Sequence, residues 1–332
     1  MDFGFNDEQQ AIKETARDML ASRSPLPKVR EAAESRTYDD SLWKEICELG
    51  WPGIAIAEEH GGQGLGMVEL AILSEELGYA CAATPFLSNA SAGIFIERAG
   101  SDEQRERWLG GVATGEERGA AAFEPRSNDL VPDAEGAAVL VLNDGDQAVA
   151  VAAGDADIAT VELIDATRSY ARVSASGGDP LPGDVEAAAD RSVVALAAEL
   201  TGIAQRALEI AVDYAKERQQ FDRPIGAYQA VSHRCAGMLY DTEEARSLTY
   251  YAAWAADAEP ESLPLAASMA KARASDAAWR VTNDALQVLG GIGFTWEHDL
   301  HFFLKRAKVG GELLGDARMH RERVASLAGL AA

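Results

Sequence analysis

Three long helical stretches in the C-terminal part of the chain leave few folds open to it. Apolar residues repeat with helical spacing from Val193 to Tyr214, and two further helices are predicted over residues 228–257 and 263–289. The connections between these stretches are short, and long helices with short connections pack side by side in antiparallel order. Residues 190–332 are therefore predicted to form a helical bundle.

The rest of the chain divides into two zones with different periodicity. Helical patterns run through residues 1–118, where Asn6 and Gln9 have the spacing of a capping box at the first helix. In residues 119–189 short apolar runs alternate with Gly, Asp and Asn, which indicates strands and turns. The sequence therefore predicts a mainly α fold with a small β domain: an N-terminal helical domain over 1–118, a short β domain over 119–189 and a C-terminal bundle over 190–332. Further helices are predicted at 39–49, 67–80, 86–99 and 102–110, and strands at 137–142, 148–152 and 159–164.

Charge and cysteine content exclude several classes of function. The chain has 332 residues, with 30 Lys and Arg against 54 Asp and Glu, so its net charge of −24 disfavours binding to nucleic acid and to anionic membranes. No apolar run is long enough for a transmembrane helix, and the N-terminus lacks the apolar core of a signal peptide. Three separated cysteines indicate neither a disulfide framework nor a zinc site, which favours the cytoplasm. Among the five histidines one pair, His298 and His301, is closely spaced, but neither a Cys nor an ExxH partner helix accompanies it, which disfavours a metal site.

Two segments at predicted helix ends contain residues suited to a ligand. The first, residues 217–226, joins two helices, and Arg218 stands in the last turn of its helix, where a cation is favourable. The second, residues 286–294, contains Gly290 and Gly291, which permit close approach of a phosphate to the backbone. Ordinary structural explanations are open for both: a helix-to-helix turn with a salt bridge for the first, and a helix C-cap for the second.

These two segments, in this order and about 60 residues apart, resemble the flavin-binding segments of the acyl-CoA dehydrogenase family. Similar stretches occur along nearly the whole chain. They are residues 7–10 (Asp-Glu-Gln-Gln), 58–64 (Glu-Glu-His-Gly-Gly-Gln-Gly), 75–78 (Glu-Glu-Leu-Gly) and 224–229 (Pro-Ile-Gly-Ala-Tyr-Gln). The resemblance implies an N-terminal helical domain, a middle β domain and a C-terminal four-helix bundle, in agreement with the zones above.

The resemblance also implies an activity and its cofactor. Members of the family use FAD to oxidise the Cα–Cβ bond of an acyl-CoA thioester, and electron-transfer flavoprotein is the implied acceptor. In the family the ADP half of FAD is held across a subunit interface. By carry-over, the residues of this chain that would hold a neighbour's FAD are Arg218, Phe221, Gln229, Gln287, Gly290 and Gly291. No residue is assigned to a metal.

The chain departs from the family where the flavin ring and the catalytic carboxylate are expected. Counting from the family motifs places Leu314 where many members have the base and Ser192 where others have it. The carboxylates nearby, Glu312 and Glu199, are the candidates for a displaced catalytic base. In the β zone the expected Thr-Glu-Pro-x-x-Gly-Ser segment is degraded to residues 123–129, and the expected Trp-Ile-Thr segment is absent because the zone contains no Trp.

The segments that would serve a neighbour's flavin are kept, while those that would hold this subunit's own flavin ring and base are missing. This contrast leads to the hypothesis that the chain is the companion subunit of a heteromeric acyl-CoA dehydrogenase, similar to the short partner chains of actinobacterial steroid-type α2β2 enzymes. Its predicted partners are a second acyl-CoA dehydrogenase-like subunit or another copy of itself, together with an acyl-CoA substrate. The first alternative is a self-sufficient homo-oligomeric dehydrogenase that uses Glu199 or Glu312 as its base. The second is a binding or scaffold protein of the same fold without redox activity.

The segment that follows the second turn is open to two interpretations. Residues 295–301 resemble a run common in the steroid-type branch, which predicts Trp296 or His298 near the partner's ligand or flavin. The other interpretation is a helix start capped by Thr295. A local basic stretch comes next, and it is predicted either to face phosphates of CoA or FAD or to balance helix charges: Lys305, Arg306 and Lys308.

Overall fold

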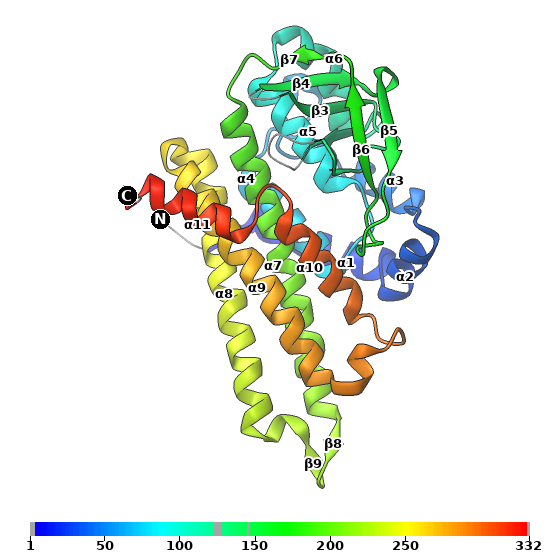
Figure 1. The fold of residues 1–332 in the computed structure, drawn as a ribbon, viewed down its shortest axis with the longest axis vertical. Coiled ribbons are helices and arrows are strands. Elements are labelled where there is room, and N and C mark those ends of the chain that lie inside the picture. Colours follow the sequence, from blue (N-terminus) through cyan, green and yellow to red (C-terminus); the bar gives the residue numbers. More distant parts are fainter. Residues whose placement is uncertain (1–3, 123–127, 145–146, 331–332) are drawn as a thin grey trace.

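The computed structural model describes residues 4–122, 128–144 and 147–330. Helices make up most of it, and a small β region lies beside the N-terminal helices, above the long bundle (Figure 1). The mainly helical architecture with a small β part is therefore confirmed. Residues 123–127, which contain most of the degraded segment of the β zone, lie outside the described residues.

The N-terminal helices begin at polar caps. Gln9 N donates to Asn6 Oδ1 at 2.8 Å and Asn6 N donates to Gln9 Oε1 at 3.1 Å, so the predicted capping box is confirmed. The sequence pattern does not predict the second helix, because Pro25 and Pro27 at its start are typical of a turn, although the first helical turn also tolerates proline. The helices are α1 (Asp7–Arg23), α2 (Leu26–Ser35), α3 (Asp40–Glu48), α4 (Met67–Ala80), α5 (Phe86–Ala99) and α6 (Asp102–Thr114).

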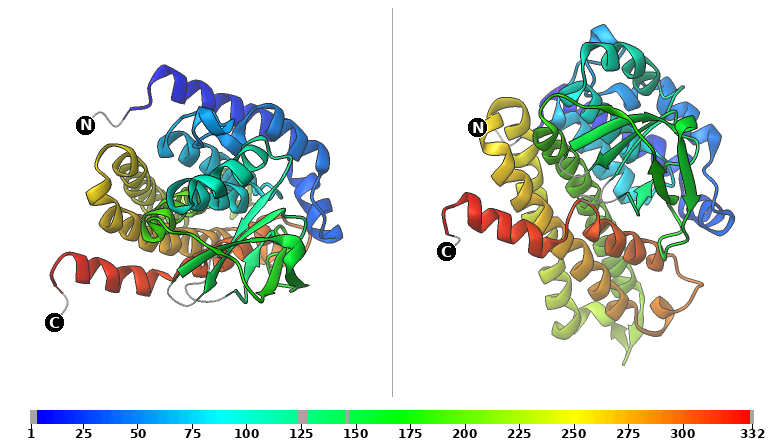
Figure 2. Two further views of the ribbon diagram at one scale, coloured as in Figure 1. Left: turned by 90° about the horizontal axis from the view of Figure 1, so that it is seen from above. Right: turned by 45° about the horizontal axis from the view of Figure 1, so that its top comes forward.

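The bundle consists of α7 (Val185–Glu217), α8 (Gln229–Ala258), α9 (Leu263–Leu289) and α10 (Leu300–Glu312), and α11 (Ala317–Leu327) packs against α9 (Figure 2). Asp184 Oδ1 accepts a hydrogen bond from Ala187 N at 2.9 Å and caps α7. This helix therefore includes residues 185–189, which the sequence assigns to the end of the β domain. None of the helices in the described part of the chain combines the length and the apolarity needed to cross a membrane.

The β region contains two small sheets. The strands of the first are, in order, β1 (Gly119–Ala121), β3 (Val139–Asp144), β4 (Gln147–Ala152) and β7 (Asp179–Pro180); those of the second are β2 (Val131–Pro132), β6 (Tyr170–Ala175) and β5 (Ala156–Thr160). The strand predicted at 159–164 is displaced, because β5 ends at Thr160 and the chain then leaves the sheet. Ile164 is 58% exposed there, while Asp165 turns into the interior.

Short 3-10 turns connect the longer elements. They are η1 (Trp51–Gly53), η2 (Glu58–His60), η3 (Ala153–Asp155), η4 (Ile225–Ala227), η5 (Pro260–Ser262) and η6 (Gly290–Phe294).

Helices α4 and α7 cross in direct backbone contact. Every residue from Asp190 to Ala204 of α7 is buried, because neighbouring helices cover this segment. A β-carbon added at Gly202 would lie 1.9 Å from Glu75 O, and one added at Gly78 would lie 2.1 Å from Glu199 O. Only glycine fits at these two positions, and the crossing fixes the N-terminal helices on the bundle.

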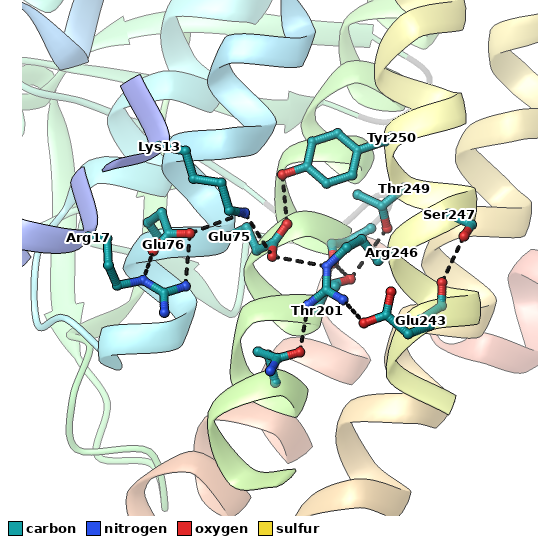
Figure 3. A network of polar contacts seen from close by, with 12 residues as sticks. Lys13, Arg17, Glu75, Glu76, Thr201, Glu243, Arg246, Ser247, Thr249 and Tyr250 are labelled. Carbon is teal, nitrogen blue, oxygen red and sulfur yellow. Dashed lines mark hydrogen bonds and ion pairs between the residues drawn. The ribbon is translucent and has the colours of Figure 1, made fainter. Parts of the chain in front are cut away.

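A buried acidic pair next to this crossing joins three helices (Figure 3). Glu75 of α4 accepts hydrogen bonds from Lys13 Nζ at 3.2 Å, from Arg246 Nε at 3.2 Å and from Tyr250 OH at 2.6 Å. Burial alone raises the pKa of the Glu75 carboxyl, but these cationic and hydroxyl partners outweigh it, so its pKa is lowered. The neighbouring Glu76 binds Lys13 and Arg17 of α1 in the same way. These contacts explain why two adjacent carboxylates can lie in the interior.

Candidate functional site

The segment between α7 and α8 is a tight hairpin at one end of the bundle. Strand β8 (Gln219–Gln220) pairs with β9 (Arg223–Pro224), and the two residues between them, Phe221 and Asp222, have φ of 54° and 64°. A two-residue turn with both residues left-handed is a type I′ hairpin turn, which favours Gly, Asn and Asp. Phenylalanine in this conformation costs on the order of 1–3 kcal/mol, and the Phe221 side chain is 85% exposed. A strained aromatic residue held out in solvent indicates a functional constraint.

Arg218 and Gln229 lie on either side of this hairpin. The backbone N–H of Arg218 donates to Tyr214 O at 2.9 Å and ends α7, and its carbonyl accepts from Ile225 N at 2.8 Å. The guanidinium is exposed and has no hydrogen-bond or ion-pair partner among the residues that the structure describes. Gln229 is the exposed first residue of α8. Both side chains are therefore available to a molecule outside this chain.

The second predicted segment forms an open turn after α9. Gly290 has φ 61° and ψ −138°, a conformation that suits glycine. A β-carbon at Gly290 or Gly291 would have no neighbouring atom within 4 Å, so the backbone of both residues faces open space. Gln287 is exposed in the last turn of α9, and Phe294 is 71% exposed beyond the glycines.

The fold brings both turns to the same end of the bundle, because α7 and α9 run toward it and α8 runs away from it (Figure 1). Apolar side chains from both turns pack on one small core beneath them: Tyr214, Ile225, Leu286 and Ile292. We call residues 217–229 and 287–294 the bundle tip. All six predicted cofactor residues lie there, and no hydrogen bond within the described chain links those of one turn to those of the other.

The positions expected to carry a catalytic base hold no available carboxylate. Leu314 is buried, and Ser192 is buried with its hydroxyl donating to Ala188 O at 3.1 Å. Glu312 lies on the exposed side of α10 and accepts from Lys308 Nζ at 2.5 Å. Glu199 is 4% exposed, and its Oε2 accepts from Arg168 Nη2 at 2.7 Å. Both candidate carboxylates are therefore engaged by cations of the same chain.

The Arg168–Glu199 pair belongs to a buried cluster where the β domain meets the bundle. We call Asp133, Asp165, Arg168, Glu199 and Arg306 the junction cluster. Arg306 donates to two backbone carbonyls, Ala82 O and Thr167 O, both at 2.8 Å, and its Nε lies 3.8 Å from Asp165 Oδ2. Arg168 Nε lies 4.0 Å from Asp133 Oδ2, and Asp133 also accepts hydrogen bonds from Tyr38 and Ser88. Five charged side chains of this chain therefore meet at the junction.

Burial and pairing shift the pKa values in the junction cluster in opposite directions. Burial opposes the charged form of Arg168, but Glu199, Tyr170 and the acidic neighbours raise its pKa well above the ordinary value. Burial raises the pKa of Asp133, and Arg168 counteracts only part of that effect. Sequence reasoning missed this cluster. The signal available to it was Arg168, one of few arginines in an acidic β zone, three positions after Asp165.

The basic stretch after the bundle tip does not act as one surface. Arg306 is 1% exposed and belongs to the junction cluster, so the prediction that it faces a phosphate is wrong. Lys308 pairs with Glu312, and Lys305 lies over the Trp296 ring, 4.0 Å from its centroid. The prediction that Thr295 caps the next helix is also wrong, because α10 begins at Leu300 and the Thr295 hydroxyl donates to Ile292 O at 2.8 Å.

The loop after α10, in which Leu314 lies, is held by two buried side chains. Lys271 of α9 donates to Gly311 O at 2.9 Å and to Gly315 O at 3.0 Å. His320 of α11 is 2% exposed, and its Nε2 lies 2.9 Å from Leu314 O. Burial lowers the pKa of His320 to about 4. The imidazole is therefore neutral in the folded protein at neutral pH.

Folding stability is expected to fall as the pH drops from about 6.5 toward 4, and His320→Gln should remove part of this dependence. In this range the unfolded chain protonates His320 and the folded chain does not, so acid favours unfolding by about 2 kcal/mol at pH 5 for this one group. Urea unfolding at pH 7 and pH 5 measures the difference. The exposed His233→Gln is the control. If both variants lost the same free energy of unfolding between pH 7 and pH 5, His320 would contribute nothing to the acid sensitivity.

Comparisons with known proteins agree with this architecture. Two protein-family models match the sequence. The acyl-CoA dehydrogenase N-terminal domain matches residues 6–116, and the acyl-CoA dehydrogenase C-terminal domain matches residues 185–328. The chain is 34% identical to acyl-CoA dehydrogenase IpdE2 of Mycolicibacterium smegmatis over 325 residues, which cover 96% of this chain and 98% of that protein. It is 26% identical to the mitochondrial short-chain specific acyl-CoA dehydrogenase of Bos taurus, with 96% and 89% covered.

Solved structures show the same fold. The Tcur3481-Tcur3483 steroid ACAD superposes with a TM-score of 0.89 at 27% identity, covering 97% of this chain and 98% of that one. The ChsE4-ChsE5 complex from Mycobacterium tuberculosis superposes with a TM-score of 0.90 at 23% identity, with all of both chains covered. Both domain models and a full-length relative above 30% identity agree, so this chain belongs to the acyl-CoA dehydrogenase family.

Proposed function

We propose that this chain is the companion subunit of a heteromeric, FAD-dependent acyl-CoA dehydrogenase, and that its bundle tip completes the FAD site of a catalytic partner. The complex would desaturate an acyl-CoA thioester between Cα and Cβ and pass electrons to electron-transfer flavoprotein. The observation that carries the proposal is the contrast between the two regions of this chain. At the bundle tip the side chains of Arg218, Gln229 and Gln287 have no hydrogen-bond partner among the described residues. The two candidate bases, in contrast, are each bound to a cation of the same chain.

The bundle tip fits the phosphate-bearing half of FAD. The Arg218 guanidinium has no partner in the described chain and can form paired hydrogen bonds with a pyrophosphate. The open backbone at Gly290 and Gly291 permits a phosphate or an adenosine to approach, and Gln287 and Gln229 offer amides beside it. Phe221 offers an exposed aromatic face. When bound, FAD supplies the hydride acceptor, and the residues of this chain would only bind and orient it.

The chain's own junction supports the second half of the proposal. A catalytic base must reach the α-proton of the substrate, and its pKa must allow it to accept that proton. Glu199 is enclosed and bound to Arg168, and Glu312 is bound to Lys308 on an exposed helix face. The self-sufficient alternative needs one of them to be released from its cation. The scaffold alternative leaves the strained, exposed Phe221 and the free Arg218 without a role.

The relatives support a heteromeric assembly. Two of the matching structures, the Tcur3481-Tcur3483 steroid ACAD and the ChsE4-ChsE5 complex, are each named after two different chains. We infer that a second acyl-CoA dehydrogenase-like chain with an intact base assembles with this one, as an α2β2 tetramer.

Purification of the chain alone, and by an N-terminal tag from its native cells, tests the proposal. The lone chain is expected to be colourless, and the native preparation is expected to contain a second dehydrogenase-like chain with bound flavin. In that complex, Arg218→Ala should weaken FAD binding by about 1.5–3 kcal/mol, which is roughly 10- to 150-fold. The exposed Arg318→Ala on α11 is the control. A lone chain that retains stoichiometric FAD and reduces it with an acyl-CoA would contradict the proposal.

A further inference from the structure

A cleft of about 370 Å³ lies between α2, the segment after β5 and the start of α10. Its walls are largely apolar, and two large apolar side chains stand open at its mouth: Trp296 is 71% exposed and Ile164 is 58% exposed. Three cations also line it: Arg30, Arg36 and Lys305. Two carboxylates, those of Glu34 and Asp165, line it as well.

Aromatic rings form one wall of the cleft. The Trp296 and His301 rings meet edge to face with centroids 4.8 Å apart, and His301 lies against Phe302 at 4.1 Å. Burial lowers the pKa of His301 to about 4, so this ring is neutral at neutral pH. Its Nδ1 lies 3.5 Å from Lys305 Nζ. The wall therefore offers flat, uncharged surface beside one ammonium group.

The three cations differ in whether their charge is balanced. Arg30 forms ion pairs with Asp299 and, at 3.7 Å, with Glu34, and Arg36 lies 3.5 Å from Glu162. Asp165 also lines the cleft, but its carboxylate is 1% exposed and turns toward Arg306 and the Tyr170 hydroxyl. Lys305 has no carboxylate within ion-pair distance among the described residues, and its Nζ lies over the Trp296 ring. Burial lowers the pKa of Lys305, and the negative charge of Asp165, which forms no ion pair with it, offsets only part of that effect.

We propose that this cleft binds a small planar aromatic anion, with the flat ring system against Trp296 and His301 and the single negative group on Lys305. One cation without an ion-pair partner among the described residues matches one negative group, and the apolar walls match a ring system. This site is separate from the FAD-binding role of the bundle tip, and it does not depend on the proposed function. It gives Trp296 and Lys305, both singled out in the sequence, a common ligand.

Two fluorescent probes that share most of their ring system separate the charge from the shape. Anilinonaphthalene sulfonate carries one sulfonate, and N-phenyl-naphthylamine is its uncharged counterpart. The full-length chain is expected to bind the sulfonate at least tenfold more tightly than the neutral probe, because a charge-assisted contact to Lys305 is present only with the sulfonate. Lys305→Met should bring the ratio of the two dissociation constants close to one, and Trp296→Ala should weaken the binding of both probes.

The chain contains a matched control on the same helix. Lys308 also lies near a tryptophan, 5.7 Å from the Trp279 centroid, but Glu312 neutralises it and neither residue lines the cleft. Lys308→Met should therefore leave the ratio of the two affinities unchanged. Equal effects of Lys305→Met and Lys308→Met, or equal affinity of the wild-type chain for both probes, would overturn the proposal. Circular dichroism confirms that each variant is folded, which is expected because the replaced side chains are partly or fully exposed.

Discussion

Replacing Gly202 by alanine is expected to lower the free energy of unfolding by about 3 kcal/mol or more. The new methyl group would lie 1.9 Å from the carbonyl oxygen of Glu75 and 2.7 Å from the backbone nitrogen of Tyr79. These are backbone atoms of a buried helix, so they cannot turn away as a flexible side chain could. Helices α4 and α7 would have to separate, because Gly78 on the other side of the crossing is also in close contact, and a β-carbon there would lie 2.1 Å from Glu199 O of α7.

A second effect of the same substitution acts in the opposite direction and is smaller. Alanine favours a helix over glycine by about 1 kcal/mol, so the clash must exceed this gain for the protein to lose stability. Gly110 of α6 isolates the gain, because a β-carbon there would have no neighbouring atom within 4 Å. Gly110→Ala is therefore expected to be neutral or slightly stabilising in urea unfolding. If Gly202→Ala and Gly110→Ala had the same free energy of unfolding, this result would contradict direct backbone contact between α4 and α7.

The sequence predicts correctly those elements whose ends are marked by the residues next to them. Helices α4 and α9 begin and end at the predicted residues, because a helical apolar pattern with glycine at a boundary marks each of them. The position of the bundle tip also follows from local pattern, since two helix ends and the chain direction place both turns at one end.

The junction cluster could not be predicted in this way, because its arginines and carboxylates come from four segments that are far apart in the sequence. Arg168 lies between β5 and β6, Glu199 lies in the middle of α7 and Arg306 lies on α10. Each residue alone fits an exposed, solvated position, and only the packing of the β domain against the bundle brings them together. The same reason explains the wrong prediction for Arg306, which lies next to Lys305 in the sequence but on the buried side of its helix.

Arg168→Met is expected to destabilise the fold by about 3–5 kcal/mol, because it leaves buried carboxylates without their cation. Methionine keeps much of the volume of the arginine stem, so the loss would come from charge more than from a cavity. Glu199 would then have no cationic partner within hydrogen-bond distance, and Asp133 would lose the only arginine that approaches it to 4.0 Å in the described part of the chain. Thermal and urea unfolding at neutral pH measure the effect.

The double variant Arg168→Met/Glu199→Leu separates pairing from simple loss of contacts. If the two charges stabilise each other, removing both should cost clearly less than the sum of the single variants, since an apolar pair of similar volume often replaces a buried ion pair at little cost. Additive losses would mean that Arg168 acts through other neighbours.

Glu199→Gln in the flavin-containing complex connects this result to function. If Glu199 only pairs with Arg168, the replacement should leave turnover per flavin unchanged. If Glu199 removes the α-proton, turnover should be lost while FAD is retained, and this result would support the alternative of a self-sufficient enzyme.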